Sequence, residues 1–479
     1  MERVVIIGGG LGGLTAGALL AGRGFSVTLL EKHRVVGGCA TTFPRPGGFM
    51  CEASLHEMDS LYDDPIKREV FEELGLYDRL DFVSPEAFFA VQTQRGRFVM
   101  PKGVEAAKAA LCERFPKESD AIVRYFALIE DLARTLRRLQ YPRTLADRLA
   151  MPWRWGRLRR YAAISVQAMM DRLFRDEALK LVLNANIGYY HDAPSRLSFL
   201  LHAAAQYGYY RGSGWYIKGG SQRLSDALAA HITAHGGRVV TRAEVTGIAK
   251  ERVTFRHKNE THTLPCDRII SNLSPADTCR LAGHLYKESR EIGMSLFNVY
   301  LGFDKDLREI IPHNAYVTFF PPEGIRLRDI GGICRRPVAE RGFSFVDYSR
   351  IDSGLTPQGR SVATLATYDR MSGWEGLSRE AYRARKAQAV EAMLANLSHR
   401  YPGILDHLVF AEGATPLTIR RYIGTPEGTP YGFAPTTESY FRRRVRACLP
   451  NLHFVGQWAA GGGFTPAIQS GWQVCRALL

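Results

Sequence analysis

RVVIIGGGLGG, residues 3–13, is the stretch that decides the fold. Its β-branched first half predicts a buried parallel strand, because apolar residues occupy every position from Val4 to Ile7 rather than alternate ones. Gly8, Gly10 and Gly13 have the spacing Gly-x-Gly-x-x-Gly. In this pattern the first glycine permits a tight turn, the second lets a pyrophosphate approach the backbone, and the third lets the following helix pack on the sheet.

A second strand, residues 26–31, supports this interpretation because it ends in Glu31. An acid at that position is placed to accept hydrogen bonds from the ribose hydroxyls of a dinucleotide. The helix dipole and the free N–H groups of the first turn would hold its phosphates. A glycine-rich turn without a ligand is the alternative, which the combination of strand, helix and acid disfavours.

The whole chain has the composition of a folded globular protein. Its 479 residues are 46% hydrophobic and 23% charged, which excludes disordered, collagenous and coiled-coil chains and predicts two or three domains. The net charge of +15 favours an anionic partner, so nucleic acid, anionic lipid and a phosphate cofactor all stay open. Eight cysteines are scattered singly, so no metal site or disulfide scaffold is expected and a reducing compartment fits.

Two uncharged stretches, residues 4–22 and 447–475, are long enough to cross a bilayer. Their glycines, prolines and amides would cost heavily in hydrocarbon, so both are interpreted as loops rather than spans. The first also lacks the features of a signal peptide. We expect a soluble, cytoplasmic chain, with peripheral attachment to a membrane as a further possibility.

Residues 31–43, EKHRVVGGCATTF, carry a second glycine pair soon after the ribose acid. Here the chain resembles the FAD-dependent amine oxidase and phytoene desaturase superfamily, in which such a pair lies beneath the flavin. Residues 48–56, GFMCEASLH, look like a motif of its carotenoid isomerases and retinol saturases. Glu52 stands where that group commonly has Asp and Ser54 where it has Gly. His56 matches and is a catalytic candidate; a buried structural histidine is the alternative.

The carboxyl-terminal part contains the other half of the resemblance. Residues 451–458 read as a strand and turn, and residues 461–463 are glycines that lead through Pro466 into a helix over 467–478. In the resembled family this helix start faces the pyrimidine end of the flavin. Gln457 departs from the acidic residue of many relatives, although an amide can still bind a ribityl hydroxyl.

Residues 420–433 resemble the family segment near the flavin face. Tyr431 is therefore the second catalytic candidate, and Gly432 is expected beside it in the active-site wall. The resemblance implies the following FAD-binding residues: Gly8, Gly10, Leu11, Gly12, Gly13, Glu31, Lys32, Gly37, Gly38, Cys39, Ala40, Thr41, Val245, Gly456, Gln457, Thr465, Pro466, Ala467 and Ile468. Val245 would contribute its backbone, against the adenine.

Because both ends of the chain belong to one nucleotide fold, the middle must leave that fold and return to it. The fold class expected is α/β, a Rossmann-like FAD-binding domain of the glutathione-reductase type interrupted by a mixed α+β substrate domain. The FAD-binding domain is expected over residues 1–85, 215–290 and 410–479, and the substrate domain over 86–214 and 291–409.

The substrate region holds an aromatic cluster and a basic segment. The cluster would suit a long apolar or polyene ligand, although core packing is the stronger explanation for any single member. Its members are Tyr189, Tyr190, Phe199, Tyr207, Tyr209, Tyr210, Trp215 and Tyr216. Residues 134–175 contain eleven arginines and two acids with tryptophans among them, which suits either an anionic membrane surface or a solvated basic helix. No recognition motif supports nucleic acid.

The resemblance implies an FAD-dependent oxidoreductase that acts on carbon–carbon bonds of a hydrophobic polyene or isoprenoid substrate, by desaturation, saturation or cis–trans isomerisation. The flavin would exchange the hydride, and the protein would supply orientation and a dry pocket. Amine or fatty-acid oxidation is a second interpretation. A binding protein like a GDP-dissociation inhibitor, which shares the fold without redox activity, is a third. No residue identifies the electron partner.

Overall fold

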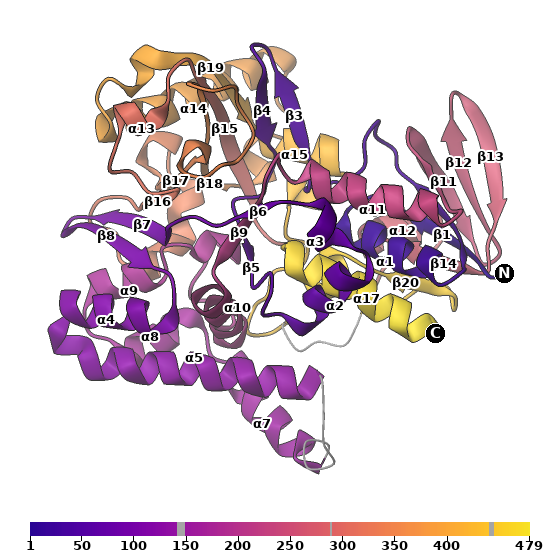
Figure 1. Ribbon diagram of the computed structural model, residues 1–479, viewed down its shortest axis with the longest axis horizontal. Helices are drawn as coiled ribbons and strands as arrows, with labels where there is room; N and C mark the ends of the chain where they lie inside the picture. Colours follow the sequence, from indigo (N-terminus) through magenta and orange to yellow (C-terminus); the bar gives the residue numbers. More distant parts are fainter. Residues whose placement is uncertain (141–148, 288–289, 440–444) are drawn as a thin grey trace.

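The computed structural model describes residues 1–140, 149–287, 290–439 and 445–479 (Figure 1). A five-stranded parallel sheet organises the part that contains both termini. Its strands, in spatial order, are β10 (Arg238–Val240), β2 (Ser26–Leu30), β1 (Arg3–Ile7), β14 (Arg268–Ser271) and β20 (Leu452–Phe454). Segments hundreds of residues apart therefore form one sheet.

Both faces of this sheet are covered, which is why β1 is apolar from Val4 to Ile7. Val4 and Ile6 pack in one cluster with helices, whereas Val5 and Ile7 pack in another with a three-stranded antiparallel sheet. The helices are α1 (Leu11–Gly22), α11 (Gln222–Ala234) and α17 (Phe464–Leu478). The small sheet consists of β11 (Ala243–Ala249), β12 (Arg252–His257) and β13 (Glu260–Pro265), followed after β14 by α12 (Pro275–Leu281).

A seven-stranded sheet organises the second part of the molecule. Its strands, in spatial order, are β19 (Leu408–Ala414), β15 (Ser295–Phe303), β18 (Ser361–Asp369), β17 (Phe343–Asp347), β16 (Val317–Phe320), β7 (Ala87–Thr93) and β8 (Gly96–Pro101). Helix α14 (Arg379–Arg400) packs on it through Met393 and Leu397, and α13 (Leu307–Ile310) and α15 (Pro416–Ile423) lie beside it.

A helical layer lies below this sheet in Figure 1. It consists of α4 (Val104–Arg114), α5 (Ser119–Gln140), α7 (Met151–Ala162), α8 (Val166–Leu173), α9 (Glu177–Leu183) and α10 (Phe199–Gly212). Part of the basic segment expected over 134–175, residues 141–148, lies outside the described residues. Within the described part of the chain, no helix combines the length and apolarity needed to cross a bilayer.

Short elements join the two parts. They are the hairpin of β3 (Thr42–Arg45) and β4 (Phe49–Glu52), the strands β5 (Met58–Asp59), β6 (Phe82–Val83) and β9 (Gly214–Ile217), and the helices α2 (Pro65–Glu73), α3 (Leu76–Arg79) and α16 (Gln457–Ala460). Strand β9 pairs with both β5 and β6. The chain crosses between the two parts at these elements.

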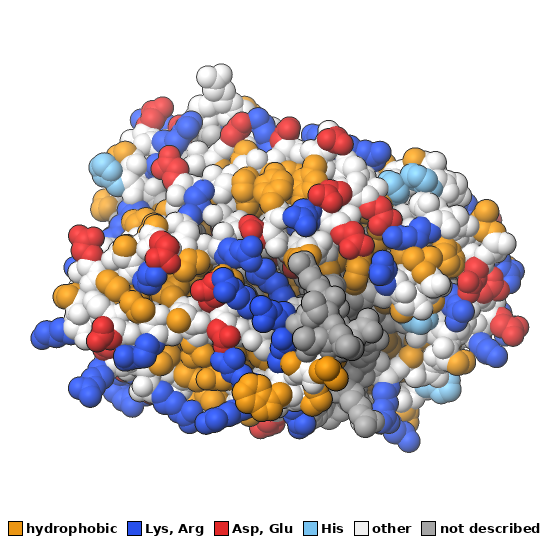
Figure 2. Space-filling model, turned by 60° about the horizontal axis from the view of Figure 1, so that its bottom comes forward, with side chains coloured by type: hydrophobic (Ala, Val, Ile, Leu, Met, Phe, Trp, Pro, Cys, Tyr) orange, Lys and Arg blue, Asp and Glu red, His pale blue; other side chains and the backbone are white. Residues whose placement is uncertain are grey.

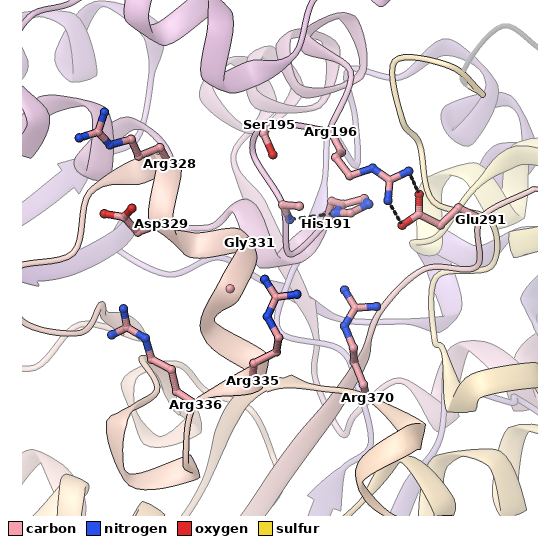
Figure 3. Close-up of a pocket in the computed structure, with 12 residues that line it drawn as sticks. His191, Ser195, Arg196, Glu291, Arg328, Asp329, Gly331, Arg335, Arg336 and Arg370 are labelled. Atoms are coloured by element: carbon pink, nitrogen blue, oxygen red, sulfur yellow. Dashed lines mark hydrogen bonds and ion pairs between the residues drawn. The ribbon is translucent and has the colours of Figure 1, made fainter.

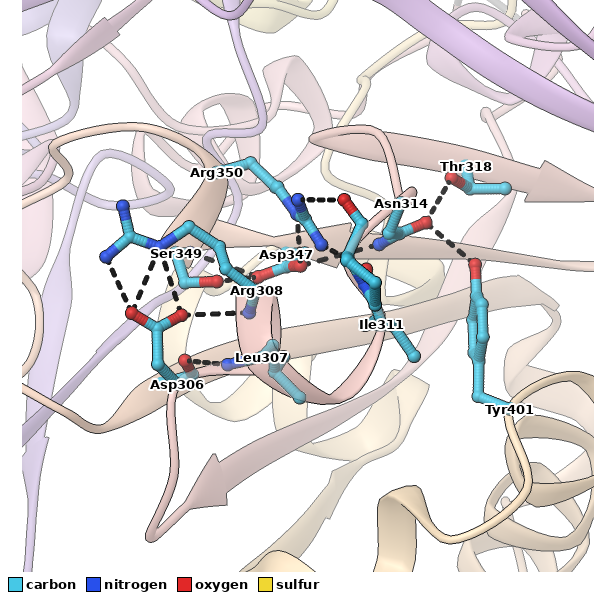
Figure 4. Close-up of polar contacts among 12 residues, drawn as sticks. Asp306, Leu307, Arg308, Ile311, Asn314, Thr318, Asp347, Ser349, Arg350 and Tyr401 are labelled. Atoms are coloured by element: carbon cyan, nitrogen blue, oxygen red, sulfur yellow. Dashed lines mark hydrogen bonds and ion pairs between the residues drawn. The ribbon is translucent and has the colours of Figure 1, made fainter.

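A buried polar network fixes the loop before β16 to the seven-stranded sheet (Figure 4). Asp347, fully buried, accepts hydrogen bonds from the Ser349 hydroxyl at 2.6 Å and from Arg350 Nε at 3.2 Å. Asn314 Oδ1 accepts from the hydroxyls of Tyr401 at 2.7 Å and Thr318 at 2.9 Å. Burial raises the pKa of Asp347 despite these partners.

The expected fold class is confirmed by this α/β architecture and by the solved structures reported below. Two boundaries differ in detail. Strand β19 belongs to the seven-stranded sheet, so the chain leaves that sheet after Ala414 rather than at residue 410. Helix α17 begins at Phe464, three residues before the predicted start, because Pro466 fits within the first turn as well as at its first position.

Candidate active site

The predicted cofactor loops meet at one edge of the five-stranded sheet. Gly8, Glu31, Asn272 and Gly456 follow the carboxyl ends of β1, β2, β14 and β20, and all four strands run parallel. In open α/β sheets, ligands bind in the crevice outside these carboxyl ends. The topology therefore brings the amino-terminal and carboxyl-terminal glycine loops together.

Hydrogen bonds hold the first loop in place. The N–H of Gly9 donates to Oε2 of Glu31 at 2.8 Å, and Oε1 of the same carboxylate accepts from the N–H of His33 at 2.8 Å. The N–H of Gly37 donates to the carbonyl of Gly9 at 2.7 Å. Among the described residues, no side chain caps the start of α1, so its first N–H groups stay available to an anion.

The packing around the glycines tests whether a dinucleotide fits. A Cβ atom on Gly12 would stand 2.5 Å from the backbone nitrogen of Gly456, and one on Gly10 would meet the Asn272 amide. A Cβ on Gly13 would meet the carbonyl of Gly8. The loop therefore tolerates no side chain, as expected where a pyrophosphate must reach the backbone. The residues present fit FAD.

The second glycine pair lies directly over this loop. Gly37 forms an isolated parallel bridge with Gly10, and both Gly37 and Gly38 have positive φ, 127° and 60°. Burial raises the pKa of the neighbouring Cys39 thiol to about 12, so it stays protonated. The Ala40 carbonyl accepts from Ser225 at 2.7 Å, and the Thr41 hydroxyl donates to Gly38 at 2.9 Å.

The carboxyl-terminal loop closes the same site. Gly456 has φ of 76°, and its N–H donates to the Ser470 hydroxyl at 2.7 Å. Within the part of the chain that is described, no side chain caps α17 at Gly463. The hydroxyl of Thr465 donates to Asp59 at 2.6 Å, which ties the helix start to β5. Ala467 follows in the first turn, and Ile468 is buried in the core.

Tyr431 and Gly432 pack against this loop. A Cβ on Gly462 would lie 2.7 Å from Cα of Tyr431, and one on Gly432 would meet the Gln457 carbonyl. Cys39, from the other glycine pair, adds to the effect of burial in raising the pKa of Tyr431. Tyr431 therefore lies between the two sets of glycines.

Comparison with known proteins agrees with this geometry. The family model described as flavin containing amine oxidoreductase matches residues 11–479. The chain belongs to this family. It is an FAD-dependent oxidoreductase, as the resemblance implied, which leaves the binding-protein interpretation without support.

Relatives in the family include enzymes of retinoid and carotenoid chemistry. All-trans-retinol 13,14-reductase of Homo sapiens is 25% identical, over 99% of this chain and 85% of its own. A 4,4'-diapolycopene oxygenase of Methylomonas sp is 26% identical, over 99% and 97%. A solved oxidoreductase of Methanosarcina mazei has a TM-score of 0.65 at 18% identity, over 99% of this chain and 100% of its own.

Glu52 and Ser54, where this chain departs from the family motif, are hydrogen-bonded to neighbouring segments. Glu52 is buried and accepts hydrogen bonds from the N–H of Ser221 at 2.9 Å and its hydroxyl at 2.6 Å. Burial raises the pKa of Glu52. Ser54 has ordinary backbone geometry and donates its hydroxyl to the Cys39 carbonyl at 2.7 Å, so the glycine common in relatives is not needed here.

His56 follows this segment, and its ring centre lies 5.8 Å from that of Tyr189 in an edge-to-face contact. Burial lowers the pKa of His56 to about 4, so the imidazole is neutral at physiological pH. A neutral imidazole can donate or accept a hydrogen bond but carries no charge. The catalytic role of His56 stays a prediction.

The aromatic cluster divides into two groups. Phe199, Tyr210 and Tyr216 are fully buried and belong to the core, as the packing alternative predicted. Tyr189 lies next to His56 and Glu57, and Tyr190 lies near Glu57. The hydroxyls of both tyrosines have no hydrogen-bond partner among the described residues.

Three residues of the site were missed by the sequence. Asn272 lies between Gly10 and Gly456, and only the strand order reveals it. Glu57 is buried with both carboxyl oxygens unpartnered in the described chain, and burial first, then Asp59, raises its pKa to about 8. Gly424 approaches Lys32, since a Cβ there would lie 2.7 Å from Nζ. Val245 lies in β11, two residues after Ala243. The N–H of Ala243 donates to the Glu31 carbonyl at 2.8 Å, so β11 begins beside Glu31.

Proposed function

We propose that this oxidoreductase exchanges a hydride with an allylic or conjugated carbon of a long hydrophobic substrate of the polyene or isoprenoid class. The reactions of its relatives, named for a retinol and a diapolycopene, support this substrate class. Bound FAD would accept or donate the hydride at its N5 atom. The observation that carries the proposal is the wall of uncharged side chains beside the glycine loops, formed by His56, Tyr189 and Tyr431.

These side chains would orient the substrate by packing and would not form an ion pair with it. Aromatic rings bury large apolar areas and pack edge-to-face, as His56 and Tyr189 do over 5.8 Å. The three side chains are half-buried, and a substrate packed against them would exclude water from the hydride path, which suits transfer between carbon and flavin. Desaturation, saturation and isomerisation share this arrangement and differ in the electron partner.

Oxidation of an amine is the competing interpretation within the family. A protonated amine needs an ionised carboxylate for its charge. Glu57 is the unpartnered carboxyl in the described part of this wall, and its pKa of about 8 keeps it largely neutral near pH 7. A neutral acid suits an uncharged substrate better than a cation.

Anaerobic reduction of the bound flavin by a panel of compounds tests the proposal. Polyenes, retinoids, fatty acids and amines are mixed separately with the purified holoprotein, and loss of flavin absorbance near about 450 nm is recorded. We expect bleaching by a polyene or retinoid, or reoxidation of pre-reduced flavin by one. Bleaching by amines alone would contradict the substrate class and select amine oxidation.

We also propose that α7 attaches the protein to an anionic membrane surface. Trp153 is 83% exposed and Trp155 41% exposed, beside the arginines at 154, 157, 159 and 160. Tryptophan at the interface and basic residues near anionic headgroups both favour such attachment. Figure 2, which turns the bottom of Figure 1 forward, shows Lys and Arg side chains along the lower edge of this face with hydrophobic side chains among them.

Co-sedimentation with liposomes of mixed anionic and neutral lipid tests the attachment. Neutralising the four arginines is expected to lower the binding constant by up to roughly a thousandfold, since each contributes about 1 kcal/mol near such a surface. Binding that is unchanged by the four substitutions would remove the proposal.

A further inference from the structure

A cavity of about 580 Å³ lies between the helical layer and the seven-stranded sheet, and none of the glycines of the cofactor loops lines it (Figure 3). Four segments line it: residues 191–196, Glu291, the 3₁₀ helix Leu327–Arg335 with Arg336, and Arg370 at the end of β18. Nothing in the family chemistry described above accounts for this cavity.

The lining is strongly basic. Its guanidinium groups belong to Arg196, Arg328, Arg335, Arg336 and Arg370. Arg196 pairs with Glu291 at 2.5 Å, and Arg370 pairs with the buried Asp192 at 2.5 Å. Within the described chain, Arg328, Arg335 and Arg336 have no ion pair. Like charges held this close favour an anion among them.

A buried histidine forms the floor of the cavity. His191 is 3% exposed, and its Nδ1 accepts the N–H of Ala193 at 2.8 Å and lies 3.0 Å from Oδ1 of Asp192. With Nδ1 as an acceptor, the proton of the neutral ring is on Nε2, and the cationic ring carries a proton there as well. Nε2 is buried without a hydrogen-bond partner among the described residues. Figure 3 shows the ring directed between the Arg196–Glu291 pair and Arg370.

The cavity adjoins the wall of the flavin site. Tyr368, two residues before Arg370, packs on Gly188, where a Cβ would stand 2.6 Å from its ring. Burial, then the nearby Asp192 and Tyr431, raises the pKa of Tyr368. Tyr368 therefore lies between the cavity and Tyr431, and Glu291 is joined to the same wall because its carbonyl accepts the N–H of Ala434 at 2.9 Å.

We propose that this cavity is a binding site for a phosphate or diphosphate group, held by Arg335, Arg370 and Nε2 of His191. Five guanidinium groups face the carboxylates of Glu291, Asp329 and Asp192, so a surplus of positive charge remains that a phosphate dianion balances. Arginine forks match phosphate oxygens in pairs of parallel hydrogen bonds. A carboxylate, with one negative charge, balances the cavity less well.

Two ligands carry this group and suit the position of the cavity. An isoprenoid diphosphate would place its charged end here. A nicotinamide dinucleotide would place its diphosphate here and act as the electron partner. The inference concerns the phosphate site itself and stands whether or not the substrate class proposed above is correct.

Calorimetric titration of the flavin-loaded protein with inorganic diphosphate at low salt tests the site. Because the flavin remains bound, the glycine loop near Gly10 cannot account for the binding. We expect a Kd below about 1 mM. Arg335→Gln and His191→Asn should each weaken binding about tenfold, because each removes one charge-assisted or buried donor. The Asn amide oxygen can still accept the Ala193 N–H, so the second variant keeps the local fold.

Arg383→Gln is the matched control, because Arg383 is an exposed arginine of α14 that does not line the cavity. It removes the same charge and should leave the Kd unchanged. Binding that is absent up to about 10 mM diphosphate, or equal in all four proteins, would overturn the proposal. Two further measurements identify the molecule that carries the phosphate. One is displacement of diphosphate by an isoprenoid diphosphate, and the other is reduction of the flavin by a nicotinamide dinucleotide. Arg335→Gln should weaken whichever of the two is observed.

Discussion

Glu31 accepts the N–H of Gly9 at 2.8 Å, so the residue expected to bind the ribose also fixes the phosphate loop. A carboxylate has lone pairs for both tasks. The loop is therefore held in its binding geometry before the cofactor arrives, which lowers the entropy cost of binding.

Glu31→Gln is expected to weaken FAD binding about tenfold and Glu31→Ala about a hundredfold, because the amide keeps one acceptor for Gly9 whereas alanine keeps none. Reconstitution of the apoprotein, followed by flavin fluorescence, measures both constants. Equal affinities for the two variants would show that the bond to Gly9 is irrelevant to binding.

Gly10→Val is expected to abolish FAD retention. A Cβ at this position meets the Asn272 amide and the added methyls fill the path of the pyrophosphate. The ratio of flavin to protein absorbance in the purified variant checks this. Gly156→Ala is the control, since a Cβ there meets nothing within 4 Å and the residue lies in helix α7. Normal flavin content in Gly10→Val would refute the assignment of the loop.

Glu57 makes stability depend on pH. Its folded-state pKa of about 8 lies above the value of about 4.3 in an unfolded chain, so between these values the native state holds the extra proton. The stability that this group contributes is fully present below about pH 4. It is lost as the pH rises from there through about 8, and the free energy of unfolding falls by up to about 1.4 kcal/mol per pH unit in that window.

Glu57→Gln removes this dependence while keeping size and polarity. We compare the free energy of unfolding by urea at about pH 5 and about pH 8. Relative to the parent protein, the free energy of unfolding of the variant should be higher at about pH 8 than at about pH 5 by several kcal/mol. A difference that does not change with pH would mean that Glu57 is paired in solution.

The pH profile of flavin reduction tests the state of His56. Because its pKa is lowered to about 4, no ionisation of His56 is expected above about pH 5. His56→Asn should lower the rate by about tenfold or less through poorer positioning, with an unchanged profile shape. A limb near about pH 6.5 that disappears in the variant would instead identify a charged His56.

The cofactor site could be predicted from sequence because glycine spacing reports backbone requirements directly. Gly8–Gly13, Glu31 and the glycines around Gly456 each follow a short, mostly apolar strand, and local pattern suffices to place them. Their meeting in space followed from the resemblance, since no local signal joins β1 to β20.

Other features depend on packing that a sequence pattern does not encode. Asn272 enters the site only because β14 lies next to β1. Glu57 reads as an ordinary charged residue until its burial is known. The cavity at His191 collects arginines from three separate segments, whereas the basic segment at 134–175 drew attention because its charges are contiguous.

The position of β1 at the centre of its sheet has a consequence during synthesis. One neighbour of β1, strand β2, begins at Ser26. The other neighbour, β14, begins only at Arg268. Until that residue leaves the ribosome, one edge of a strand that is apolar from Val4 to Ile7 has no partner, and such edges recruit other chains. The nascent protein is therefore expected to need chaperone protection for more than half of its translation.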